Sequence, residues 1–168
     1  MSNYKGHVAG AAVAGVTYAL AVQLFPGNQL DSARTLMDNW QTLAGLLVVA
    51  MLFGLWPDVD TNSKAQDLYI GLAFVSDILL IITGNIEAAA YLGLIAMTPI
   101  VGKHRGWTHS RIAMLLVPLP LVIIPWLYRS DLLPFGLLFY GAAVAGYFSH
   151  LLLDGLIIHG IGHRTKRW

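Results

Sequence analysis

The sequence predicts an all-α protein, a polytopic bundle of about six transmembrane helices, and three observations support this fold class. Of the 168 residues, 57% are hydrophobic and only 11% are charged, against about 25% charged in an average soluble domain. The mean hydropathy is +0.64. The apolar residues form continuous runs, not the alternating pattern of a membrane β-barrel. So few charges cannot cover a soluble globule of this size, which excludes a soluble domain, a disordered chain and a nucleic-acid-binding module.

Six apolar runs are candidates for the membrane spans. A span needs about 20 mostly apolar residues, or fewer when it is enclosed by protein. The second and fourth runs are short enough to be partial crossings. Together the six runs predict one integral-membrane domain over residues 1–168. The expected spans are 7–25, 43–56, 68–83, 88–101, 112–128 and 133–158.

The longest polar stretch, 26–41, is expected to be an outer loop that carries a short amphipathic helix over 32–40, with Ser32 as its N-cap. A competing interpretation concerns the first run, which resembles a signal peptide with a cleavage site at Ala19, Leu20 and Ala21. The run is rich in glycine and alanine, however, which is typical of a helix that packs against other helices.

The distribution of lysine and arginine predicts the orientation, because these residues are enriched in cytoplasmic segments. With the N-terminus inside, only Arg34 and Arg129 fall in outer loops. We therefore expect an inner-membrane protein with six spans and both termini in the cytoplasm. The remaining eight basic residues fall on the cytoplasmic side, and they are Lys5, Lys64, Lys103, Arg105, Arg111, Arg164, Lys166 and Arg167.

The ionisable residues near the spans are not scattered, although such residues are costly in a membrane and therefore informative. They occur at the start of the first span, after the second, before the fifth and late in the sixth. The topology inferred from lysine and arginine places all four groups toward the cytoplasmic end. These residues are His7, Asp58, Asp60, His104, His109, His150 and Asp154.

The spacing within these groups suits metal binding. His150 and Asp154 are four residues apart, so they share one face of a helix and can bind one ion together. Asp58 and Asp60 are expected on an extended segment, which would point both carboxylates to the same side. The chain has no cysteine, and nitrogen and carboxylate ligands without sulfur suit zinc, manganese or iron, often as two ions in hydrolytic sites.

The two histidines before the fifth span are five residues apart, which is awkward for one regular helix. If Thr108 caps that span, His104 lies on the preceding loop and His109 on the first turn. Each residue taken singly has an ordinary explanation, such as a cap, a turn or a solvated charge. The seven candidate ligands together on one membrane face indicate an ion.

Small residues predict how the first and sixth spans pack. Gly6, Gly10 and Ala14 form a stripe beside His7, and small residues let helices approach closely in lipid. The sixth span carries a similar group one turn before His150, namely Gly141, Ala142, Ala145 and Gly146. If these two stripes meet, His7 comes near His150 and Asp154.

Three ionisable residues are left outside this site. Asp77 lies midway along the third span, where it is expected to pair with a buried polar group or to cap a helix break. His159 and His163 follow the sixth span in a basic tail. They are expected to be solvated or near lipid headgroups.

The order of these motifs resembles the YdjM-type family of membrane-bound, metal-dependent hydrolases, some of which are LexA-regulated. The resemblance runs from His7 to about Gly155. Its most specific element is the block His-Arg-Gly-Trp-Thr-His-Ser at 104–110, supported by Ser-His-Leu-Leu-Leu-Asp at 149–154. That family is distantly similar to zinc-dependent phospholipase C and P1 nuclease.

The resemblance implies a set of metal ligands, although two features depart from the family pattern. Thr61 and Asn62 stand where many members have His-Pro, and the usual Thr-Pro does not follow Asp154. The residues that match the family's ligands are Asp58, His104, His109, His150 and Asp154, with looser matches at His7 and Asp60.

These observations predict an integral-membrane metal-dependent hydrolase, phospholipase C-like or phosphatase-like, that cleaves a phosphoester or ester at the cytoplasmic interface. Its cofactor would be a divalent metal, zinc before manganese or iron. Asp58 or Asp60 would bridge ions or act as a general base, and Arg105 would stabilise a phosphate or an oxyanion. The expected partners are the lipid bilayer and a lipid or phosphorylated substrate, without nucleic acid. The alternative is a divalent-metal transporter or a metal-binding structural membrane protein.

Overall fold

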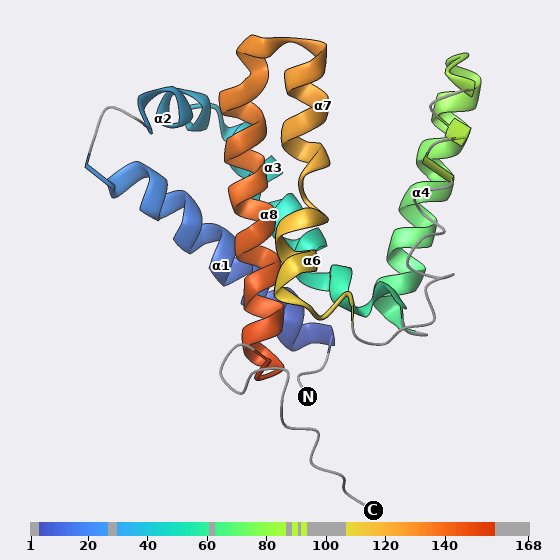
Figure 1. Ribbon diagram of the computed structural model, residues 1–168, viewed down its shortest axis with the longest axis horizontal. Coiled ribbons are helices and arrows are strands. Elements are labelled where there is room, and N and C mark those ends of the chain that lie inside the picture. The colour runs from blue at the N-terminus through green and yellow to red at the C-terminus, as the bar shows by residue number, and fades with distance from the viewer. Residues whose placement is uncertain are drawn as a thin grey trace, which may run out of the picture. The chain divides into compact units, whose positions relative to one another are not determined.

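The computed structural model describes residues 4–26, 30–60, 63–86, 89–90, 92–93 and 107–156. Within these ranges the regular elements are all helical, which confirms the predicted all-α class (Figure 1). Five helical segments are long and apolar enough to cross a membrane. They are Tyr4–Leu24, Trp40–Val59, Lys64–Ile82, Arg111–Tyr128 and Ser130–Leu153.

These five segments match five of the six predicted spans. The predicted fourth span, 88–101, lies outside the described residues except for 89–90 and 92–93. The expected crossing directions of the spans, with both termini cytoplasmic, stay a prediction.

The chain divides into two compact units. Unit 1 comprises Met1–Leu55 and His109–Trp168, and unit 2 comprises Trp56–Thr108. In unit 1, helix α8 (Leu133–Leu153) packs against α1 (Tyr4–Leu24), α3 (Trp40–Leu55) and α7 (Pro120–Tyr128) (Figure 1). Because α1 and α3 also pack against each other, these helices form a three-helix core of α1, α3 and α8.

Glycines set the close approach of the three core helices. A Cβ atom on Gly146 of α8 would overlap the backbone of Ala50 in α3. A Cβ atom on Gly54 of α3 would overlap the side chain of Ala11 in α1 and lie 3.2 Å from the Gly146 carbonyl oxygen. Without aqueous solvent to drive association, helices in lipid gain stability from such backbone contact. The predicted packing of the first and sixth spans is confirmed.

Prolines break the fifth span into α6 (Arg111–Leu116) and α7. Pro118 lacks a backbone N–H group, so the helical ladder cannot continue through it. Leu119 donates its backbone N–H to the Leu116 carbonyl at 3.2 Å instead of to the Leu115 carbonyl, as a regular helix would. The hydroxyl of Tyr140 on α8 donates to the released Leu115 carbonyl at 3.0 Å, which satisfies a polar group that lipid could not.

The opposite end of unit 1 is closed by α2 (Asp31–Met37), where an apolar cluster includes Val22, Met37, Leu46 and Leu138. The polar stretch 26–41 does carry a helix. The expectation that Ser32 caps it is wrong, because the N-cap is Leu30 without a side-chain hydrogen bond. The expected end at residue 40 is also wrong, because α2 ends at Met37 and Trp40 begins α3.

Helix α8 ends earlier than the predicted 158. Asp154 is its C-cap, and Gly155 adopts a φ of 73°, a left-handed conformation that glycine reaches without strain. Gly155 donates its N–H to the Leu152 carbonyl and Leu156 donates to the Leu151 carbonyl, both at 3.0 Å. This double bond pattern is a Schellman motif, which terminates the helix at Asp154.

Unit 2 contains a short 3-10 helix, η2 (Trp56–Asp60), followed by α4 (Lys64–Ile82). The segment expected to be extended around Asp58 and Asp60 is therefore 3-10 helical, so that expectation is wrong. Ser63 caps α4, since its Oγ accepts from the Gln66 backbone N–H at 3.3 Å. Only 6% of the candidate membrane span in α4 is buried.

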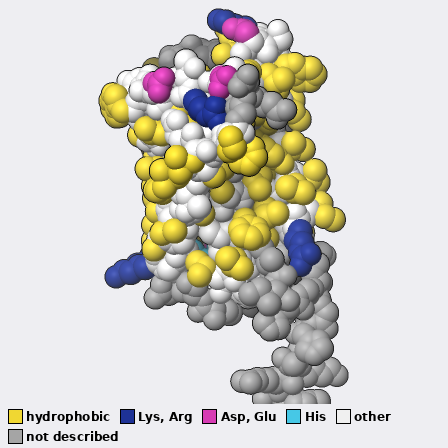
Figure 2. Space-filling model, turned by 90° about the vertical axis from the view of Figure 1, so that its left-hand side faces the viewer, with side chains coloured by type: hydrophobic (Ala, Val, Ile, Leu, Met, Phe, Trp, Pro, Cys, Tyr) yellow, Lys and Arg dark blue, Asp and Glu magenta, His cyan; other side chains and the backbone are white. Residues whose placement is uncertain are grey.

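Hydrophobic side chains dominate the face of the molecule shown in Figure 2. They form a broad belt, and the charged side chains on this face gather above and below it. An apolar belt bounded by charges is the surface that a lipid bilayer requires. The fold and its surface therefore define a helical membrane protein.

Candidate metal centre

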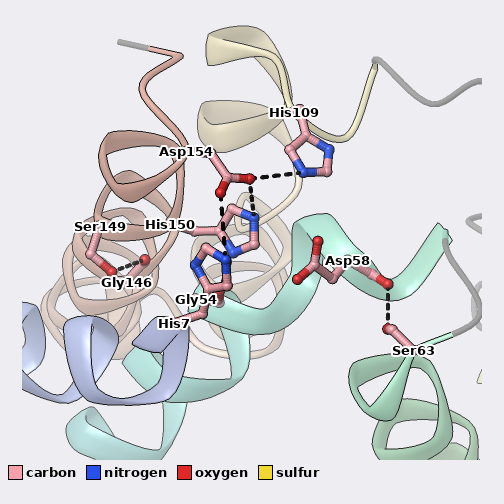
Figure 3. Close-up of polar contacts among 9 residues, drawn as sticks. All are labelled: His7, Gly54, Asp58, Ser63, His109, Gly146, Ser149, His150 and Asp154. Atoms are coloured by element: carbon pink, nitrogen blue, oxygen red, sulfur yellow. Dashed lines mark hydrogen bonds and ion pairs between the residues drawn. The ribbon is translucent and has the colours of Figure 1, made fainter. Parts of the chain in front are cut away.

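Three histidine rings surround one carboxylate at the end of unit 1 where α1 begins and α8 ends (Figure 3). The carboxylate belongs to Asp154. Its Oδ1 lies 3.6 Å from Nε2 of His7, and its Oδ2 lies 3.5 Å from Nε2 of His150 and 3.7 Å from Nε2 of His109. Residues from α1, from the segment before α6 and from α8 thus converge on one acidic group.

The close packing of α1 and α8 places His7 directly against His150. Their rings are stacked, with centroids 3.8 Å apart and planes inclined by 17°. Both residues are buried, with 2% and 0% of their surface exposed. The predicted approach of His7 to His150 and Asp154 is confirmed. Two buried imidazoles in contact cannot both be protonated without a large desolvation cost, so this centre favours neutral rings.

A backbone carbonyl fixes the orientation of His150. Its Nδ1 lies 2.8 Å from the carbonyl oxygen of Gly54 in the last turn of α3. A carbonyl can only accept, so Nδ1 carries the proton and donates it. In the neutral ring the lone pair is then on Nε2, which is the nitrogen that faces Asp154. Metal-binding histidines are commonly oriented by a second-shell bond of this kind.

His109 precedes the helix instead of lying in its first turn. The N-cap of α6 is Ser110, whose Oγ accepts from the Ala113 backbone N–H at 3.0 Å. The expectation that Thr108 caps this span is therefore wrong, because Ser110 already satisfies the first exposed N–H groups. The shift places the His109 ring edge-on to His150, with centroids 5.3 Å apart.

The donor set and its spacing fit a divalent cation. The ligand atoms of His7, His150 and Asp154 all lie within 4.8 Å of one another. Their contacts with the carboxylate exceed the 2.7–3.2 Å of an N–H···O hydrogen bond. Two ligand atoms held about 2.0–2.1 Å from one tetrahedral zinc ion lie about 3.3 Å apart, close to the observed spacing. Asp154 Oδ1 is also buried without a hydrogen-bond partner among the described residues.

The remaining predicted site residues lie elsewhere. Asp58 is on η2 in unit 2, where its carbonyl accepts from the Ser63 hydroxyl at 2.8 Å. The backbone of Asp60 ends the same element. Ligation by either aspartate stays a prediction. His104, Arg105, His159 and His163 lie outside the described residues.

Asp77 lies within α4, away from either helix end, so the expected helix break does not occur there. Its Oδ1 is buried, and no hydrogen-bond partner is present for it among the described residues. The expected partner for this carboxylate is therefore not among them.

Two features of the site were not anticipated from the sequence. The carbonyl of Gly54 orients His150 although the two residues are 96 positions apart. Gly155 ends α8 and so makes Asp154 a C-cap. A glycine directly after the last apolar residues is a recognisable stop signal, whereas a long-range carbonyl contact leaves no local signature.

The helices and the buried His–Asp cluster together define a class, the helical integral membrane proteins with a candidate metal centre. A comparison with protein families is more specific, because residues 1–163 match the model of the YdjM inner membrane protein family. The chain belongs to this family. No curated protein and no solved structure matches the chain.

Proposed function

We propose that this protein is an integral-membrane metal-dependent hydrolase that acts on a phosphoester or ester at the cytoplasmic face of the inner membrane. One observation carries the proposal, namely the buried Asp154 carboxylate with three histidine nitrogens at 3.5–3.7 Å. Burying these polar groups at the end of an apolar bundle is costly unless they have a partner, and a cation supplies one. His7, His109, His150 and Asp154 would hold the ion.

Zinc is the favoured ion because it binds imidazole nitrogen and carboxylate oxygen in four-coordinate sites, with manganese or iron as the other candidates. A divalent ion bound there supplies a Lewis acid that makes water a nucleophile near neutral pH. His150 keeps one ring orientation because Gly54 accepts its Nδ1 proton. Asp154 contributes the negative charge that neutral imidazoles lack, and the packed helices exclude bulk water around His7.

Residues beyond this cluster would complete the reaction. Asp58 or Asp60 would take the proton from water as general base. Arg105 would stabilise the charge that develops on phosphate or carbonyl oxygen, since its guanidinium is protonated at any relevant pH. The substrate would be a lipid or another phosphorylated or ester-linked molecule at the headgroup level.

The test combines metal analysis with a substrate screen. Elemental analysis of protein purified without chelators should find at least one divalent ion per chain. His150→Ala and Asp154→Ala should lose both the ion and hydrolysis, because each removes a ligand. The matched control is Asp131→Ala, which removes an exposed carboxylate that is paired with Arg129 and should keep both. The screen uses phospholipids, lipid phosphates and generic phosphodiesters in nanodiscs.

Arg105→Ala separates binding from chemistry. It should retain the ion but lose about 2–4 kcal/mol of transition-state stabilisation, as other oxyanion-stabilising donors do. Two results would overturn the hydrolase. Metal-free protein that zinc or manganese cannot reload would leave no metal chemistry. Movement of zinc or manganese into proteoliposomes, without ester cleavage and abolished by Asp77→Ala, would establish a transporter instead.

A further inference from the structure

An apolar groove of about 630 Å³ runs between α1 and α8 of unit 1. Small residues form its walls, and they include Gly10 and Ala14 on α1 and Ala145 on α8. Larger side chains stand at its edges, where Val13 is 66% exposed and Phe148 is 42% exposed. In a helix bundle that crosses a membrane, an apolar surface exposed in this way faces lipid.

The groove begins at the candidate metal centre. Gly6 and Leu153 line it, and they immediately precede His7 and Asp154 in the sequence. From Gly6 to Ala21, at about 1.5 Å per residue, the groove follows α1 for about 22 Å. The hydrocarbon of one leaflet is about 15 Å thick, half of a typical bilayer core. The groove is therefore long enough to hold a hydrocarbon chain from the headgroup level to the middle of the bilayer.

The chemistry of the walls selects an apolar occupant. Ser149 is the polar residue nearest the metal centre among the lining residues, and its hydroxyl already donates to the Gly146 carbonyl at 2.7 Å. A hydrocarbon chain requires no hydrogen bonds from its surroundings, so these walls leave none of its groups unsatisfied.

The size of the groove distinguishes a hydrocarbon chain from a helix. A helix is about 10 Å across, so a 22 Å length encloses roughly 1,700 Å³, which is more than twice the groove volume. A helix could cover the groove but could not fill it. An acyl chain is thin and flexible enough to lie within it and to contact both walls.

We propose that this groove holds an acyl chain of the substrate, so that the substrate is an acyl lipid whose ester or phosphoester headgroup lies at the His–Asp centre. This inference rests on the proposed function, because it names the substrate class of that site. Recognition comes from the chain that the groove encloses, while the cleavable bond lies at the adjoining end.

Photocrosslinking tests the groove without catalysis. Metal-free protein is placed in nanodiscs of phosphatidylethanolamine and phosphatidylglycerol that contain a phospholipid with a diazirine on its acyl chain. After irradiation, mass spectrometry should find adducts concentrated on the groove residues. Ala14→Phe, which fills the groove from α1, should lower this labelling several-fold, and so should Ala145→Phe from α8. Val16→Phe is the matched control, because Val16 is 46% exposed on α1 but does not line the groove.

Three outcomes would overturn the proposal. The first is equal labelling of Val16 and the groove residues, because that pattern is produced by the surrounding bilayer. The second is labelling that neither filling variant lowers although both variants keep the helix content and melting temperature of the parent. The third is efficient disulfide dimerisation through a single cysteine at Ala14, which the cysteine-free chain permits, because a second copy would then cover the groove.

The groove and the hydrolase can fail separately. Selective labelling without any ester cleavage would support the groove and count against the proposed function. Cleavage of a short-chain phosphodiester by protein whose groove is not selectively labelled would keep the hydrolase and overturn the acyl-chain site.

Discussion

Replacing Gly146 by alanine should weaken both the bundle and the metal centre. The new Cβ would stand 2.9 Å from the Cα atom of Ala50 and closer still to the Ala50 carbonyl oxygen. Ordinary contacts of a Cβ atom begin at about 3.4 Å. Because the obstructing atoms belong to backbone, no rotamer change relieves the overlap. Helices α3 and α8 must therefore separate by about 0.5 Å or more.

Two energetic terms set the size of the loss. Overpacking a close-packed interior costs about 1–3 kcal/mol, whereas alanine restores up to about 1 kcal/mol of helix propensity relative to glycine. We expect a net destabilisation of about 1–2 kcal/mol. The same separation would lengthen the 2.8 Å contact between His150 and Gly54 to about 3.3 Å, beyond normal hydrogen-bond range. Loss of such an orienting bond typically lowers metal affinity by 10–100-fold.

The assay is reversible unfolding in detergent, followed by zinc titration of the folded protein. Gly71→Ala is the matched control, because Gly71 lies within α4 with no atom within 4 Å of its added Cβ. It should leave metal affinity unchanged and keep or raise stability by up to about 1 kcal/mol. If Gly146→Ala matches the parent in both measurements, the close approach of α3 and α8 does not position this centre.

Three further predictions concern the rest of the bundle. Arg34→Ala should lower the unfolding free energy by about 1 kcal/mol, because the guanidinium donates to two backbone carbonyls at the end of α1; Arg129→Ala, which removes an exposed ion pair, should leave the melting curve unchanged. Tyr140→Phe should cost about 1 kcal/mol in the same assay, since an α6 carbonyl then loses its donor. Reporters fused after Trp168 and within 26–41 should report the cytoplasm and the periplasm, respectively, and a periplasmic C-terminus would contradict the predicted topology.

The course of the helices could be predicted because each span is a local property of the sequence. Continuous apolar runs located five spans, and prolines located the break in the fifth. The helix ends were harder, because several polar residues compete as caps. Ser110 caps α6 in place of Thr108, and Gly155 ends α8 before 158. In each case a short backbone contact that the apolar pattern does not contain decided the boundary.

The sequence by itself determined the chemical inventory of the candidate centre and one of its contacts. His150 and Asp154 had to share a helix face because the helical repeat brings residues four apart together, and their 3.5 Å separation agrees. Only the tertiary structure decided that His7 stacks on His150 and that Gly54 orients it. Those contacts join residues far apart in the chain. They depend on how closely α1, α3 and α8 approach, and that distance is set by the absence of side chains at glycines on facing helices.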